Sequence, residues 1–239
     1  MATPTSIWQW PVHEFLDHRL DSEQTLILEI IRSMFGKDIA GSRILEPGAG
    51  TSRVGLHLHN LGARVVVSDL SENSVNGAKL RFSEGAQTPP MGIIRSNLLA
   101  LPFRSGAVDL VWNSGVMEHF GDEDLVAGLR EMGRVSRRFV AVFVPSQFCM
   151  PYNIARMLSM GAGTWEWGLE RPKRSLQGEF HAAGLDVIDE YEFGYETDIP
   201  LYYMRLLPDQ MAAEFRKQYE KHRRWHEGIS LATLGVKRT

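Results

Sequence analysis

The strongest constraint on the fold is an alternation of short apolar runs with amphipathic segments, which continues from residue 44 to residue 145. The run "ARVVVSD" at residues 63–69 is typical of a strand buried on both faces of a parallel sheet. The preceding segment, 51–61, has helical periodicity and is followed by Gly62. Further strands are predicted at 44–46, 91–97, 107–113 and 138–145, and helices at 71–82 and from residue 122 onward. The alternation predicts an α/β fold: a Rossmann-like, doubly wound, mostly parallel seven-stranded sheet with helices on both faces.

The whole sequence is predicted to divide into three regions. Residues 1–41 combine aromatic side chains with an apolar helix, and we expect a helical lid. Residues 42–207 form the expected core, with an aromatic-rich insertion at 146–172 and later strands near 185–195 and 200–207. Residues 208–239 predict a polar helix followed by a fraying tail.

The composition excludes several classes of protein. The formal net charge of −3 argues against a nucleic-acid binder, and no apolar run reaches the roughly 18 residues of a membrane span. The N-terminus lacks the pattern of a secretory signal, and the single cysteine, Cys149, rules out an internal disulfide framework. We therefore expect a cytoplasmic monomer or homodimer that acts on a small molecule.

The stretch "RILEPGAGTSR" at residues 43–53 joins a strand to a helix through a glycine turn. Such turns cradle nucleotides, because backbone N–H groups point outward and glycine permits close approach. Gly48 and Gly50 fit a dinucleotide fingerprint, but Arg53 occupies the site of its third glycine. A Walker-type loop is absent from the sequence.

Two acids near this turn suggest what it binds. The carboxylate of Glu46 would repel a pyrophosphate but suits S-adenosylmethionine, which carries a sulfonium and an α-ammonium group. Asp69 ends an apolar strand and lies 19 residues after Gly50, where an acid can accept both ribose hydroxyls. The alternatives are a solvated glutamate beside a plain turn and an acid that complements a helix dipole.

Two further segments, "SNLLALPF" at 96–103 and "AVDLVWNSGVMEHF" at 107–120, complete a set of four ordered motifs. With them the chain resembles the class I S-adenosylmethionine-dependent methyltransferases, in the type 11-like branch, over roughly residues 43–145. The resemblance implies that the methionine part of the cofactor meets Glu46, Gly48, Ala49, Gly50, Asn113 and Ser114. It implies that Asp69 holds the ribose and that Leu70, Asn97 and Leu98 meet the adenine.

Two positions depart from the family pattern. Ser52 stands where a third glycine is frequent; a serine there can still cap the following helix, so we expect this departure to be harmless. Asn97 replaces the usual aspartate, so its side chain can donate as well as accept a hydrogen bond.

The acceptor side is predicted from what remains. His119 follows the fourth strand and could act as the catalytic base, or it could only hold the turn. Aromatic and polar side chains expected around the acceptor are Trp10, His13, Glu118, Tyr152 and Trp165. No metal site is predicted, because His222 and His226 lack a surrounding zinc motif and read as a solvated helix face.

These features together predict an S-adenosylmethionine-dependent methyltransferase. The methyl group would move by in-line displacement to an O, N or C nucleophile of a small, partly apolar acceptor. One alternative is a protein that binds the cofactor without turnover, because methyl transfer requires no particular catalytic side chain. A less favoured alternative is a Rossmann NAD(P)-dependent oxidoreductase, which Glu46 and the missing third glycine disfavour.

Overall fold

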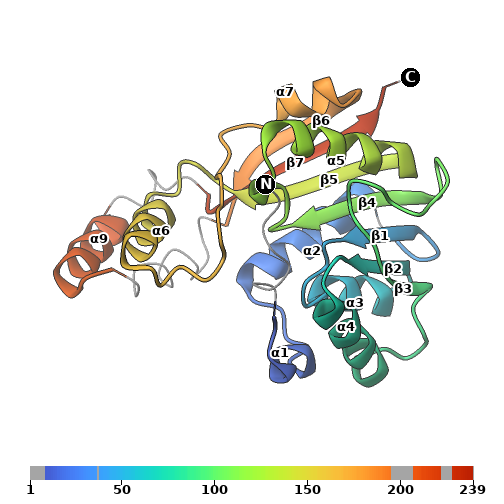
Figure 1. Ribbon diagram of the computed structural model, residues 1–239, viewed down its shortest axis with the longest axis horizontal. Coiled ribbons are helices and arrows are strands. Elements are labelled where there is room, and N and C mark those ends of the chain that lie inside the picture. Colours follow the sequence, from blue (N-terminus) through green and yellow to red (C-terminus); the bar gives the residue numbers. More distant parts are fainter. Residues whose placement is uncertain (1–8, 37, 195–206, 222–227, 239) are drawn as a thin grey trace.

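The structure is a computed structural model that describes residues 9–36, 38–194, 207–221 and 228–238. A seven-stranded sheet with the order β3-β2-β1-β4-β5-β7-β6 lies at its centre (Figure 1). Strands β1 to β5 pair in parallel, and β7 runs antiparallel to both β5 and β6. The strands are β1 Arg43–Pro47, β2 Arg64–Asp69, β3 Gly92–Arg95, β4 Val108–Ser114, β5 Ser136–Pro145, β6 Leu185–Phe193 and β7 Ser230–Lys237.

Helices cover both faces of the sheet. One apolar cluster joins one face to α2, α3 and α4, and a second joins the other face to α5 and α7. Strand residues alternate between the clusters: Ile44 belongs to the first and Leu45 to the second. The predicted fold is confirmed. The helices are α1 Val12–Leu16, α2 Ser22–Met34, α3 Arg53–Asn60, α4 Glu72–Gly85, α5 Asp122–Val135, α6 Met150–Ala162, α7 Gln177–Ala182, α9 Asp209–Lys221 and the short 3-10 helix η2 Met117–His119.

The strand order creates one preferred binding position. Strand β1 lies between β2 and β4, so the chain winds outward in opposite directions on its two sides. Ligands of such sheets bind beyond the carboxyl ends of the strands at this switch point. The glycine turn after β1 and the segment after β4 both begin there.

Strand β7 corrects the expected organisation of the chain. We expected the core to end at residue 207 and a tail to follow, but β7 lies inside the sheet between β5 and β6. The sequence signal was weak because β7 is rich in small residues. One of them, Gly235, packs so closely on the Phe180 ring that an added Cβ would lie 2.8 Å from it. The strand expected at 200–207 falls almost wholly outside the described residues.

The N-terminal region, which we expected to form a helical lid over residues 1–41, contributes partly to the core. Ile27, Leu28 and Ile31 of α2 belong to the first core cluster, so α2 is part of the domain and not of a lid. Only the described segment before α2 lies over the outside of the core. Its Phe15 is buried against α4, where Gly77 leaves no room for a Cβ beneath the ring.

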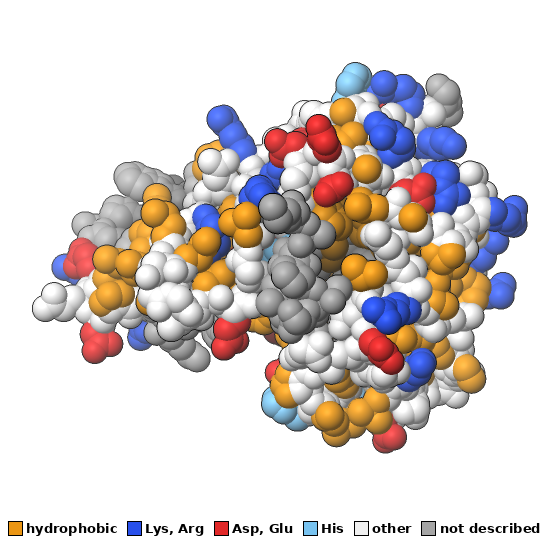
Figure 2. Space-filling model, viewed as in Figure 1, with side chains coloured by type: hydrophobic (Ala, Val, Ile, Leu, Met, Phe, Trp, Pro, Cys, Tyr) orange, Lys and Arg blue, Asp and Glu red, His pale blue; other side chains and the backbone are white. Residues whose placement is uncertain are grey.

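The insertion after β5 contains α6. Together with α9 it forms an extension beyond the end of the sheet (Figure 1). Hydrophobic side chains gather on the surface of this extension (Figure 2), and the exposed ones include Met150, Met157, Leu158 and Met160. Among the described helices, none combines the length and apolar character needed to cross a membrane.

Candidate active site

The glycine turn lies against the end of β2. The backbone N–H groups of Gly48 and Ala49 donate to the carbonyl of Ser68 over 2.8 and 3.1 Å. Gly48 has a φ of 73°, in the left-handed region, and an added Cβ would lie 2.7 Å from the Val116 side chain. Glycine is therefore required both by the backbone conformation and by the segment that follows β4.

Glu46 is buried beneath this turn and lines the central cavity. Its Oε2 accepts a hydrogen bond from Ser52 Oγ over 2.8 Å. An added Cβ on Gly55 would collide with the same oxygen, so glycine in α3 leaves space for the carboxyl group. Burial raises the pKa of Glu46 to about 8, and the Ser52 hydrogen bond and the charge of Arg81 oppose that rise. Glu46 is thus a buried acid that a cation in the cavity would ionise.

Ser52 does not cap α3 as we expected. It has a φ of 51°, and its side chain makes no capping hydrogen bond with the helix. A glycine, which is frequent at this position in the family, would readily adopt this left-handed conformation. In this chain the same backbone conformation directs the serine hydroxyl toward Glu46.

Asp69 ends β2 and is held by backbone donors. Its Oδ1 accepts from the N–H of Ser71 over 2.8 Å, and its Oδ2 accepts from the N–H of Gly50 over 2.9 Å. Burial raises the pKa of Asp69, and these hydrogen bonds oppose the rise. The backbone N–H of Leu70 also contributes to holding the carboxylate, which leaves at least one of its roughly four acceptor positions for a ligand hydroxyl.

A cavity of about 450 Å³ joins these elements. That volume lies within the range of small-molecule and cofactor sites. The cavity brings together most of the predicted site residues, namely Trp10, Glu46, Gly48, Ala49, Gly50, Asp69, Leu70, Asn97, Leu98, Ser114, Glu118 and His119.

Four predicted site residues do not line this cavity. Successive strand residues face opposite ways, so Trp112 and Ser114 face the cavity while Asn113 is buried against Met132 of α5. His13 is exposed and contacts Glu14, because α1 turns Phe15 toward the core. The last two, Tyr152 and Trp165, pack against each other in the insertion with ring centroids 6.1 Å apart.

Two tryptophans from distant parts of the chain meet beside the cavity. Trp10 and Trp167 have ring centroids 5.5 Å apart at an interplanar angle of 39°, and both line the cavity. Asn73 holds Trp10 in place by accepting from its backbone N–H over 2.8 Å. We expected Trp167 only as part of the aromatic-rich insertion, and no local motif marks it as a cavity residue.

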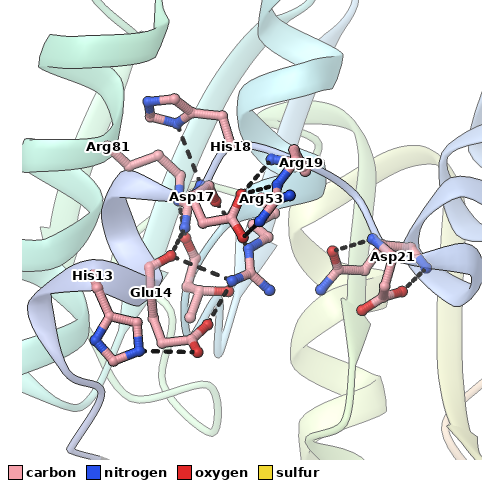
Figure 3. A network of polar contacts seen from close by, with 10 residues as sticks. His13, Glu14, Asp17, His18, Arg19, Asp21, Arg53 and Arg81 are labelled. Carbon is pink, nitrogen blue, oxygen red and sulfur yellow. Dashed lines mark hydrogen bonds and ion pairs between the residues drawn. The ribbon is translucent and has the colours of Figure 1, made fainter.

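A network of arginines fastens the N-terminal segment to the core (Figure 3). Arg81 of α4 is fully buried and donates to the carbonyls of Glu14, Asp17 and Thr51. Arg53 donates to the Asp17 carbonyl over 3.0 Å and pairs with the Glu14 carboxylate over 2.5 Å. The side chain that breaks the dinucleotide fingerprint therefore fixes the segment that carries Trp10.

The acceptor side of the cavity is acidic. Glu118 is 1% exposed, and burial together with the nearby Glu170 raises its pKa well above its usual value. Glu170 accepts from the Tyr152 hydroxyl over 2.6 Å, and burial raises its pKa to about 7. Burial also raises the pKa of Glu23 to about 7. Sequence reasoning missed Glu23 and Glu170, because one reads as a first-turn helix acid and the other as a loop acid.

His119 lies in η2 at the same end of the cavity. Its Nδ1 lies 3.2 Å from the carbonyl of Leu169. Burial lowers the pKa of His119, which keeps the imidazole neutral near pH 7. A neutral imidazole can accept a proton or bind a metal ion.

Comparison with known proteins agrees with this geometry. Residues 44–138 match a family model described as a methyltransferase domain. A ubiquinone biosynthesis O-methyltransferase from Mesorhizobium japonicum is 32% identical over 121 residues, which are 48% of this chain and 46% of the relative. The chain thus matches about half the length of this curated relative.

Solved structures share the fold at low sequence identity. Magnesium protoporphyrin IX methyltransferase from Synechocystis PCC 6803, with bound S-adenosylhomocysteine, superposes with a TM-score of 0.61 at 14% identity, over 90% of this chain and 83% of that one. A [4+2]-cyclase superposes with a TM-score of 0.63 at 17% identity, over 93% and 84%. The fold alone therefore does not define the reaction.

The fold, the glycine turn and the matched family define a class I S-adenosylmethionine-dependent methyltransferase domain. This chain carries that domain, with residues 44–138 as its matched part. The methyltransferase class predicted from the sequence is confirmed.

Proposed function

We propose that the protein transfers the sulfonium methyl group of S-adenosylmethionine to a nucleophilic atom of a small, partly apolar acceptor. The observation that carries this proposal is that one cavity is lined by both acids, Glu46 and Asp69, and by the aromatic pair Trp10 and Trp167. A lone pair of the acceptor forms the new bond to the methyl carbon. The carbon–sulfur bond breaks, and its electron pair stays on sulfur as S-adenosylhomocysteine forms.

The cofactor end of the cavity supports this assignment through its charges. Glu46 would ionise beside the α-ammonium group and pair with it, and Gly48 keeps the turn open for close approach. Asp69 would accept the ribose hydroxyls, while Leu70, Asn97 and Leu98 line the same cavity for the adenine. A phosphate would meet two carboxyl groups there, which disfavours the oxidoreductase alternative.

The acceptor end supports a small molecule with an exchangeable proton. Trp10 lies against Gly50 of the glycine turn and packs near Trp167, so the pair provides apolar surface beside the place proposed for the cofactor. The relative's O-methyltransferase activity favours an oxygen nucleophile. His119 is neutral and near this end, so it is our candidate for the group that receives the acceptor's proton. Positioning the nucleophile on the methyl axis can supply on the order of 7–11 kcal/mol of the barrier.

Two measurements test the proposal. Calorimetry should show that the wild-type protein binds S-adenosylhomocysteine and that Asp69→Ala loses most of this affinity. Incubation with S-adenosylmethionine and a panel of phenols, amines and activated carbon acids should then give a product one methyl group heavier, detected by mass spectrometry. Absence of S-adenosylhomocysteine binding would refute the proposal, whereas binding without product across the panel would favour the cofactor-binding protein without turnover.

A further inference from the structure

Three side chains meet where the central cavity adjoins a smaller one of about 150 Å³. One potential ligand atom from each of Glu118, His119 and Glu170 lies within 4.8 Å of the others. Glu118 and His119 belong to η2, just after β4, and Glu170 belongs to the insertion after β5. The cluster therefore forms only when these two parts of the chain come together.

Backbone contacts hold the two parts in register. The N–H of Arg171 donates to the Glu118 carbonyl over 2.9 Å, and Leu169 O lies 3.2 Å from His119 Nδ1. The Arg171 side chain donates to the Phe120 carbonyl over 3.2 Å. The three candidate ligands are thus positioned by the fold and not by flexible side chains alone.

Within the described part of the chain the charge of Arg156 acts on Glu170 and lowers its pKa, but Glu118 has no comparable counter-charge. Glu118 Oε2 is buried and accepts no hydrogen bond from the described residues. No described lysine or arginine forms an ion pair with Glu118, Glu170 or Glu23. Arg156 approaches Glu170 but donates to its backbone carbonyl, over 3.1 Å. A buried carboxylate without a partner is costly, so the cluster is suited to a bound cation.

We propose that Glu118, His119 and Glu170 bind one divalent first-row transition-metal ion, such as Mn²⁺ or Zn²⁺, at the acceptor end of the cavity. Two carboxylates and one imidazole suit these ions, and three protein ligands leave further coordination positions open. The His119 ring contacts the backbone at both Leu169 and Gly115; it would keep one of these hydrogen bonds and exchange the other for the ion. Tyr152, which donates to Glu170 Oε2 over 2.6 Å, would orient that carboxylate. This departs from our expectation that the chain has no metal site.

The open coordination positions suggest a use, which rests on the proposed methyl transfer. An acceptor hydroxyl bound to the ion would lose its proton to solvent water more readily. The resulting oxygen would attack the methyl carbon as the carbon–sulfur bond breaks. His119 would then be a ligand and not the base.

The test uses the untagged full chain, stripped with a chelator and free of cofactor and acceptor. Mn²⁺ binding is followed by the loss of the aqueous Mn²⁺ signal in electron paramagnetic resonance, and Zn²⁺ binding by calorimetry. The wild-type protein should bind one ion per chain. Glu118→Gln and Glu170→Gln should each weaken binding at least tenfold, and Tyr152→Phe roughly 10–100-fold at most. Glu166→Gln, which changes an exposed acid in the same insertion, should bind as wild type does.

Unfolding midpoints show whether each variant is folded. Glutamine is neutral and nearly equal in size to glutamate, so Glu118→Gln removes the charge with little change in packing. Equal affinities in wild type, Glu118→Gln and Glu170→Gln would overturn the metal site, as would no binding of either ion by wild type. S-adenosylhomocysteine binding is measured on the same samples. Metal binding without S-adenosylhomocysteine binding supports the metal site while refuting the methyl-transfer proposal, and the reverse result refutes the metal site alone.

Discussion

Ser52 donates a hydrogen bond to Glu46 over 2.8 Å from a left-handed backbone position at the start of α3. The serine side chain makes no capping hydrogen bond with α3; it contacts the acid near the end of β1 instead. Glu46 is buried, and this hydroxyl is its direct hydrogen-bonding partner. The pair links the conformation of the glycine turn to the chemistry of the cofactor end.

Replacement of Ser52 should separate these two roles. Ser52→Gly and Ser52→Ala both lose the hydrogen bond to Glu46, but only alanine must place a Cβ in the left-handed region. We expect Ser52→Ala to be less stable than Ser52→Gly by about 1 kcal/mol, as measured by urea unfolding. Equal stabilities would show that the φ of 51° carries no strain for this side chain.

Glu46→Gln should change how stability depends on pH. The pKa of Glu46 is about 8 in the folded protein and near 4.5 when unfolded, so the unfolded chain releases this proton first as pH rises. Glu46 therefore destabilises the wild-type fold progressively between these values, by up to about 1.4 kcal/mol per pH unit. Glutamine does not titrate. The free energy of unfolding of Glu46→Gln, relative to that of wild type, should therefore increase from pH 5 to pH 8. Urea unfolding at three pH values tests this, and a constant difference would contradict it.

The same residue predicts a proton change on cofactor binding. With a pKa of about 8, Glu46 is largely protonated at pH 7, and an α-ammonium group beside it would lower that pKa. S-adenosylhomocysteine binding should then release up to one proton per site. Calorimetry in two buffers of different ionisation enthalpy measures this, and Glu46→Gln should release fewer protons than wild type. Equal release by both proteins would place the titrating group elsewhere.

Arg81 should anchor the N-terminal segment. Arg81→Met would leave the carbonyls of Glu14, Asp17 and Thr51 without this donor, and a lost partner of a buried polar group costs about 1–3 kcal/mol. We expect a loss of about 3 kcal/mol in the free energy of unfolding and faster proteolysis near α1. Arg104→Met, at an exposed position, is the matched control and should leave both unchanged. A protease pattern identical to wild type would contradict the anchoring role.

The fold, and the grouping of the candidate cofactor residues around one cavity, could be predicted from the sequence because their signals are local. Apolar strands, a glycine turn and Asp69 at a strand end follow one another within a short stretch of chain. Asn113 shows the limit of motif transfer: its position in the motif suggested the cavity, but the two-residue period of β4 turns it toward α5. A strand-by-strand count of facing directions could have identified this.

The acidic end could not be predicted because it depends on tertiary packing. Glu118 lies next to a recognisable motif, but Glu170 comes from an insertion whose path the sequence does not define. Glu23 reaches the same region from the first turn of α2. No spacing in the sequence relates these three acids, so only the folded chain brings them together.

The position of β7 has a consequence for the nascent chain. Strand β6 pairs only with β7 among the described strands, and β5 needs β7 to complete its pairing. During translation, a ribosome that has released β6 but not β7 therefore carries a domain with an open edge on β5 and an unpaired β6. Open edges of this kind recruit foreign strands, so the domain stays exposed to edge-to-edge aggregation until β7 has paired.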